Sequence, residues 1–115
     1  MRGALEEIYE QDLCVPLLFY AIAMRNYSDS DFVIEDVYCN RKKVADHCII
    51  MNWYNYKPAD VLRACMYRHV PIRFGAYVYR YIRVNGTIDY SLRILPETIE
   101  IKVDDKYVPI ERYLY

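Results

Sequence analysis

The segment Ile72–Val103, IRFGAYVYRYIRVNGTIDYSLRILPETIEIKV, holds the sharpest turn signal of the chain, Asn85-Gly86, between two runs rich in Tyr, Ile, Val and Leu. An Asn-Gly pair between two such runs favours a two-residue type I′ turn, because both central positions need a positive φ. The sequence therefore predicts a β-hairpin centred on these two residues.

A two-residue loop fixes the hairpin register by counting outward from the turn. The predicted cross-strand pairs are Arg83 with Ile88, Tyr81 with Tyr90, Tyr79 with Leu92, and Tyr77 with Ile94. We expect these pairs to form the core face, because the second strand is apolar at each of them. The opposite, partly exposed face then carries Ala76, Val78, Arg80, Ile82 and Val84 on the first strand.

The residues after Pro96 predict two further strands. Residues 98–103 alternate strictly, with Ile99, Ile101 and Val103 expected to point inward. A turn at Asp104-Asp105 leads into a short return strand that contains Pro109, which has no N–H to donate and is therefore expected at a sheet edge. The C-terminal part is thus predicted to be an antiparallel meander of about four strands.

The N-terminal half is predicted to be mainly helical. Apolar residues at helical spacing indicate a first helix over residues 4–13, and the nearly uniform apolar run Leu17–Asn26 indicates a second, buried helix. Asn40 is a candidate N-cap for a helix to about Trp53, and Pro58 starts a helix that ends before Pro71. Residues 32–39 fit either a strand or a helical extension. The expected fold class is α+β, with three or four N-terminal helices packed on the meander in a single domain, 1–115.

Composition and charge exclude several classes of protein. The apolar run 14–24 is too short to cross a bilayer, and acidic residues precede it where a signal peptide carries positive charge. We therefore expect a cytoplasmic protein with no membrane partner.

The first 36 residues carry two basic and eight acidic side chains, whereas residues 37–93 carry ten basic and three acidic ones. This asymmetry indicates either a basic binding face or neutralisation inside the fold.

No pattern of residues points to catalysis. The only glycines are Gly3, Gly75 and Gly86, so no glycine-rich phosphate-binding loop is present. No nucleophile, base and orienting group are arranged together in the sequence. We therefore expect a protein that is not an enzyme and has no cofactor.

The cysteines and histidines offer a weak metal signal. Cys65 and His69 are four residues apart on a predicted helix, and Cys39, His47 and Cys48 lie upstream as further ligands. No Cys-x-x-Cys pair supports them, so buried thiols and no metal are expected. A Cys39–Cys48 disulfide is an alternative for a hyperthermophile source, to which the tyrosine-rich composition loosely points.

Arginine and tyrosine alternate around the first strand of the hairpin and in the preceding predicted helix. Such a surface can bind phosphates and stack bases, in an outline similar to a winged helix. The candidate nucleic-acid or partner-binding residues are Arg63, Tyr67, Arg68, Arg73, Arg80, Arg83 and Arg93.

Self-association is the preferred functional hypothesis, with nucleic-acid binding as the alternative. Tyrosine and arginine are enriched at protein interfaces, and an uncovered Arg80 face of the hairpin would be apolar enough to drive association. We therefore expect a homodimer or a complex with another protein, in a small non-enzymatic interaction protein such as a viral or archaeal accessory factor.

Overall fold

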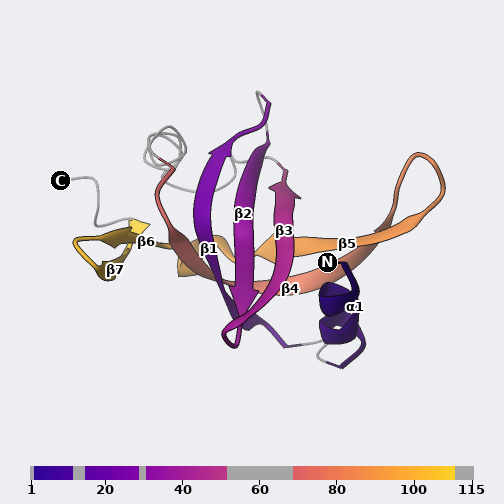
Figure 1. Cartoon of the computed structure of the whole chain (residues 1–115), viewed down its shortest axis with the longest axis horizontal. Helices are drawn as coiled ribbons and strands as arrows, with labels where there is room; N and C mark the ends of the chain where they lie inside the picture. The colour runs from indigo at the N-terminus through magenta and orange to yellow at the C-terminus, as the bar shows by residue number, and fades with distance from the viewer. Residues whose placement is uncertain (1, 12–14, 29–30, 52–68, 111–115) are drawn as a thin grey trace.

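The computed structural model describes residues 2–11, 15–28, 31–51 and 69–110. These residues form one α-helix, one 3-10 turn and a seven-stranded antiparallel sheet (Figure 1). The elements are α1 (Arg2–Gln11), β1 (Leu17–Asn26), β2 (Phe32–Cys39), β3 (Lys42–Ile50), β4 (Ile72–Ile82), β5 (Ile88–Ile94), η2 (Pro96–Thr98), β6 (Glu100–Val103) and β7 (Lys106–Pro109). The predicted α+β fold, with three or four helices on a four-stranded meander, is therefore wrong, because the described chain is mostly β.

Two segments that were predicted to be helices are strands. Leu17–Asn26 is β1, and most of the segment from Asn40 to Trp53 is β3. An apolar run does not by itself distinguish a buried helix from a strand, and here the pairing of β2 with both β1 and β3 decides for strands. The helix predicted to start at Pro58 falls largely on residues 52–68, outside the described part, whereas α1 agrees with the first predicted helix.

The ambiguous segment Phe32–Cys39 is a strand, β2, joined to β3 by a two-residue turn. Asn40 and Arg41 have φ values of 51° and 65°, and Cys39 pairs with Lys42 across them. Two successive positive φ values define a type I′ turn. Asn40 is thus a turn residue rather than the N-cap of a helix.

The β4–β5 hairpin forms as predicted, but with a different turn. The N–H of Arg83 donates to the oxygen of Thr87 (2.8 Å), and the N–H of Gly86 donates to the oxygen of Arg83 (2.8 Å). Within the loop only Gly86 has a positive φ, +88°, which is the geometry of a three-residue loop with a glycine bulge. The register therefore moves by one residue, so that Tyr81 pairs with Asp89 instead of Tyr90.

This shift in register changes which side of β4 faces the core. Phe74, Ala76 and Val78 are buried, whereas Tyr77, Tyr79 and Tyr81 are only half-buried on the other face. On β5 the predicted core residues Tyr90, Leu92 and Ile94 are indeed buried. The prediction was therefore only partly right for β5, because Ile88, also predicted to be in the core, is 58% exposed. It was wrong for β4, because a slip of one residue turns a strand over relative to its partner.

Strands β5 and β6 both pair with the same edge of β4, interrupted by η2. Ile94 lies opposite Ala76 and Glu100 opposite Arg73, so Pro96–Thr98 are additional residues on this side of the ladder. Gly75 lies beside them, and its N–H donates to the hydroxyl of Thr98 (2.8 Å). This side-chain bond replaces the backbone partner that the interrupted strand cannot supply.

The C-terminal strands agree with the sequence pattern. Ile99 and Ile101 are buried, and Val103 is half-buried against the core. β7, with Pro109, lies at the end of the strand order, as predicted for a strand containing proline. Asp104 and Asp105 have φ values of 49° and 64°, so this turn is also type I′.

The sheet folds over on itself around one core. In Figure 1, β1, β2 and β3 run upright in front of β4 and β5, which cross behind them. β3 lies beside β5, and α1 packs against both these strands and β4. Phe19 of β1 and Phe74 of β4 are cross-strand partners, and their buried rings stack with centroids 6.0 Å apart. Leu5 of α1 is fully buried. This resembles orthogonal packing of two sheet layers with a helix at one end.

Substitutions of neighbouring residues on β1 separate the strand from the predicted helix. Phe19 is completely buried and Leu18 is half exposed. Phe19→Ala is expected to lower the free energy of unfolding by about 3–5 kcal/mol, and Leu18→Ala by less than about 1 kcal/mol. Urea denaturation followed by circular dichroism measures both values. If both variants lose a similar, large amount of unfolding free energy, the assignment of this segment to a strand would be contradicted.

Candidate binding surface on the β4–β5 hairpin

The structure separates the predicted site residues. Arg73, Arg83 and Arg93 have their side chains on the outer face of the sheet, together with Tyr77, Tyr79 and Tyr81. We call the outer face of β4–β5, formed by these three tyrosines and by Asp89, Ser91 and Arg93, the tyrosine face. Arg63, Tyr67 and Arg68 lie outside the described residues.

Arg80 belongs to the opposite, inner side of the hairpin. Its guanidinium lies 5.5 Å from the ring centre of Tyr9 on α1, and Tyr9 in turn contacts Tyr90. Ala76 and Val78 on the same side of β4 are buried in the core. The Arg80 face that the sequence suggested as an interaction surface is therefore divided: Ala76 and Val78 lie in the core, whereas the half from Arg80 to the loop is exposed.

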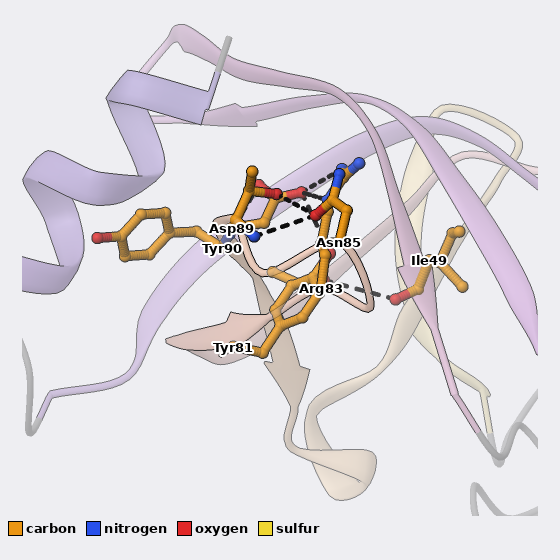
Figure 2. Close-up of polar contacts among 8 residues, drawn as sticks. Ile49, Tyr81, Arg83, Asn85, Asp89 and Tyr90 are labelled. Carbon is orange, nitrogen blue, oxygen red and sulfur yellow. Dashed lines mark hydrogen bonds and ion pairs between the residues drawn. The ribbon is translucent and has the colours of Figure 1, made fainter.

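A buried carboxylate connects the strands at the base of the hairpin loop. Asp89 is 4% exposed. Its Oδ2 accepts hydrogen bonds from Arg83 Nε (2.8 Å) and the Tyr81 hydroxyl (3.2 Å), and its Oδ1 accepts from the Tyr90 N–H (2.8 Å; Figure 2). The hydrogen bond to Asp89 raises the pKa of Arg83. These contacts fix the strand ends relative to the loop.

The loop itself is held by Asn85. Its side-chain oxygen accepts hydrogen bonds from the N–H (3.0 Å) and the hydroxyl (2.7 Å) of Thr87. An Asn side chain that binds the backbone two residues later forms an Asx-turn, which orders the loop locally. Asn85 was thus correctly identified as a turn residue, but it acts through its side chain rather than through a positive φ.

The ordered loop presents three large aliphatic side chains to solvent. Ile82 is 73% exposed, Ile88 is 58% exposed and Val84 is fully exposed. Ile82 and Ile88 are direct cross-strand partners. We call these three residues the apolar tip; the hairpin loop that carries them extends beyond the body of the molecule (Figure 1).

On the side of the hairpin opposite Ile82 and Ile88, the tyrosine face contains a small pocket. Its volume is about 250 Å³, and its lining residues are Ile49, Met51, Tyr79, Tyr81 and Ser91. The rings of Tyr79 and Tyr81 have centroids 5.8 Å apart and are tilted by 40°. The Arg93 guanidinium lies 5.2 Å from the centre of the Tyr79 ring. The pocket therefore has aromatic walls with a cation at its border.

Arg73 belongs to a different cluster, where β1, β4, β6 and β7 meet. Its Nε lies 2.5 Å from Glu100 Oε1, and its guanidinium is 4.6 Å from the ring centre of Tyr107. Tyr107 also packs edge-on against Tyr20 at 5.6 Å. The hydrogen bond to Glu100 raises the pKa of Arg73, and burial raises the pKa of Tyr107. Arg73 thus has a structural role in joining β4 to β6.

Ion pairs within the protein neutralise two arginines of the basic block. Arg73 pairs with Glu100 and Arg83 with Asp89. Among the described residues, no carboxylate lies within ion-pair distance of Arg93. The basic block of the sequence is therefore only in part a surface charge.

A second hollow, beside the η2 insertion, was missed by the sequence analysis. It has a volume of about 430 Å³ and is open to solvent. Gly75 forms part of its lining, because an outward position of β4 without a side chain leaves space between Leu18 and Leu95. A glycine within a strand pattern is a signal that could have indicated an irregularity here.

The metal and disulfide candidates are not brought together. Cys39 lies at the β2–β3 turn opposite Lys42, whereas Cys48 pairs with Ile34 further along the strands; both are buried and form no disulfide. His47 is exposed. In the described segments no three His, Cys, Asp or Glu side chains are close enough to hold one metal ion. His69 is exposed, and Cys65 lies outside these segments.

Comparison with known proteins found no family model, no curated protein and no solved structure that matches this chain. Within residues 2–11, 15–28, 31–51 and 69–110, no helix has the length and apolar character needed to cross a membrane. The function is therefore argued from the geometry of the hairpin alone.

Two aspartate substitutions test the role of the buried carboxylate. Asp89→Ala is expected to lower the free energy of unfolding by about 1–3 kcal/mol, because the buried Tyr90 N–H and the Tyr81 hydroxyl lose their acceptor. Asp46 forms an exposed ion pair with Lys43, which also binds Asp36, so Asp46→Ala is expected to cost less than about 1 kcal/mol. Chemical denaturation compares them; equal losses would show that the Asp89 contacts add no stability beyond a surface pair.

Proposed function

We propose that this chain is a small non-enzymatic binding protein of the cytoplasm that forms a two-fold dimer through the apolar tip. The observation that carries the proposal is the exposure of Ile82, Val84 and Ile88 together on one loop. Clustered aliphatic side chains that project from a body are typical of association surfaces, since water contact with them is unfavourable.

The order of the loop supports a binding role for the tip. The Asp89 and Asn85 hydrogen bonds hold the loop in one conformation. A surface that is already ordered loses less conformational entropy on binding than a mobile one. A closed two-fold dimer is the commonest assembly of such self-complementary surfaces.

Nucleic-acid binding is the second candidate, and a separate observation favours it. The tyrosines of β4 lie on the outer face rather than in the core, so their rings are available for stacking. Single-stranded nucleic acid binds to aromatic rings beside cations with little dependence on sequence. The ion pairs of Arg73 and Arg83 reduce the attraction for phosphate and rank this candidate below self-association.

Light scattering of variants tests the proposed dimer. The wild-type chain is expected to have twice the monomer mass at both low and high salt, because an apolar interface depends little on ionic strength. Val84→Lys places a charge at the tip, where no packing is lost, and is expected to give a monomer with an unchanged melting temperature.

The matched control is Ile22→Lys. Ile22 is exposed to a similar degree as Ile88 but lies on β1. This variant is expected to stay dimeric. A monomeric wild-type protein, or a dimer that survives Val84→Lys, would contradict association through the apolar tip.

A further inference from the structure

We propose that the pocket lined by Tyr79 and Tyr81 binds a single unpaired nucleobase, with Arg93 contacting the adjacent phosphate. This inference rests on the second of the two functions proposed above and names its binding site. It concerns a different surface from the apolar tip, so the two proposals can fail separately.

The size of the pocket suits one ring system. Pockets for drug-sized ligands have volumes of about 300–1,000 Å³, and this one has about 250 Å³. Two of its five lining residues are tyrosines, with Ile49 and Met51 as aliphatic neighbours. A flat aromatic group inserted beside the rings would contact apolar surface on several sides, which is the arrangement that favours stacking.

Two polar groups of the pocket already form hydrogen bonds within the protein. The Ser91 side chain is buried, and its hydroxyl lies 3.5 Å from the Ile49 carbonyl oxygen, to which it donates. The Tyr81 hydroxyl donates to Asp89. The pocket thus has π-faces but few polar groups to distinguish one base edge from another. The expected ligand is a base bound through its face, with weak preference among the four bases.

Arg93 distinguishes a nucleotide from a neutral aromatic ligand. It lies over Tyr79, at the border of the pocket, and among the described residues no carboxylate neutralises it. Arg83, the next cation along this face, is paired with Asp89. An anion next to the bound ring therefore finds one available guanidinium, which matches a base with its own phosphate.

Fluorescence anisotropy with a short labelled oligothymidylate at low salt tests the site. Tyr79→Ala is expected to weaken binding roughly 5- to 150-fold, which corresponds to the ~1–3 kcal/mol measured for stacking of one base. Tyr79→Phe keeps the ring and is expected to bind like the wild type. Arg93→Gln is expected to reduce the slope of log K against log salt by about 0.7, the value for one phosphate contact on a single strand.

Tyr27→Ala is the control, because Tyr27 is exposed at the end of β1, outside the tyrosine face. Thermal melts confirm that each variant is folded, and the changed salt slope of Arg93→Gln retains a test if Tyr79→Ala does not fold. Binding that is lost in Tyr79→Ala and kept in Tyr79→Phe and Tyr27→Ala supports the site.

Three results would contradict the binding of a base in this pocket. Oligonucleotide binding that is unchanged in Tyr79→Ala would remove the pocket but leave nucleic-acid binding in place elsewhere. If the wild-type protein does not bind the oligonucleotide at low salt, both the base-binding pocket and nucleic-acid binding in general would be contradicted. Loss of the dimer in Tyr79→Ala, without an effect on oligonucleotide binding, would show that the pocket holds a side chain of the partner copy.

Discussion

The structure depends on β4, the long strand that pairs with β1 on one edge and with β5 and β6 on the other. Its inward residues Phe74, Ala76 and Val78 are buried, and they hold the upright strands and the crossing strands around one core. Its outward residues are half-buried, and among them are Tyr77, Tyr79 and Tyr81. The same strand thus supplies the core on one side and the tyrosine face on the other.

Sequence patterns predicted the C-terminal half best. The strands from Ile72 onward, the inward Ile99 and Ile101, and the edge position of Pro109 follow from alternation and from the missing proline N–H. The helices predicted for β1 and β3 failed for a physical reason. Segments whose apolar residues are almost continuous satisfy the helical and the strand pattern equally, and only pairing with distant strands decides between them.

One additional residue in the hairpin loop decides which side chains form the candidate site. A two-residue and a three-residue hairpin loop are both compatible with Asn85-Gly86, yet they place Tyr77, Tyr79 and Tyr81 on opposite sides of the sheet. Arg73, Arg83 and Arg93 lie on the outer face of the sheet. The partners of Arg73 and Arg83 were not foreseeable, since Glu100 is distant in sequence and the Asp89 contact requires the observed register.

The three-residue insertion at η2 limits how the length of this segment can vary. In β5 the buried apolar positions are even-numbered, as in Leu92 and Ile94. After Pro96–Thr98 they are the odd-numbered Ile99 and Ile101, although both strands follow one edge of β4. The odd number of inserted residues resets the alternation. Loss or gain of one residue here would turn the apolar row of β6 towards solvent, so the length of this segment can change only in steps of two.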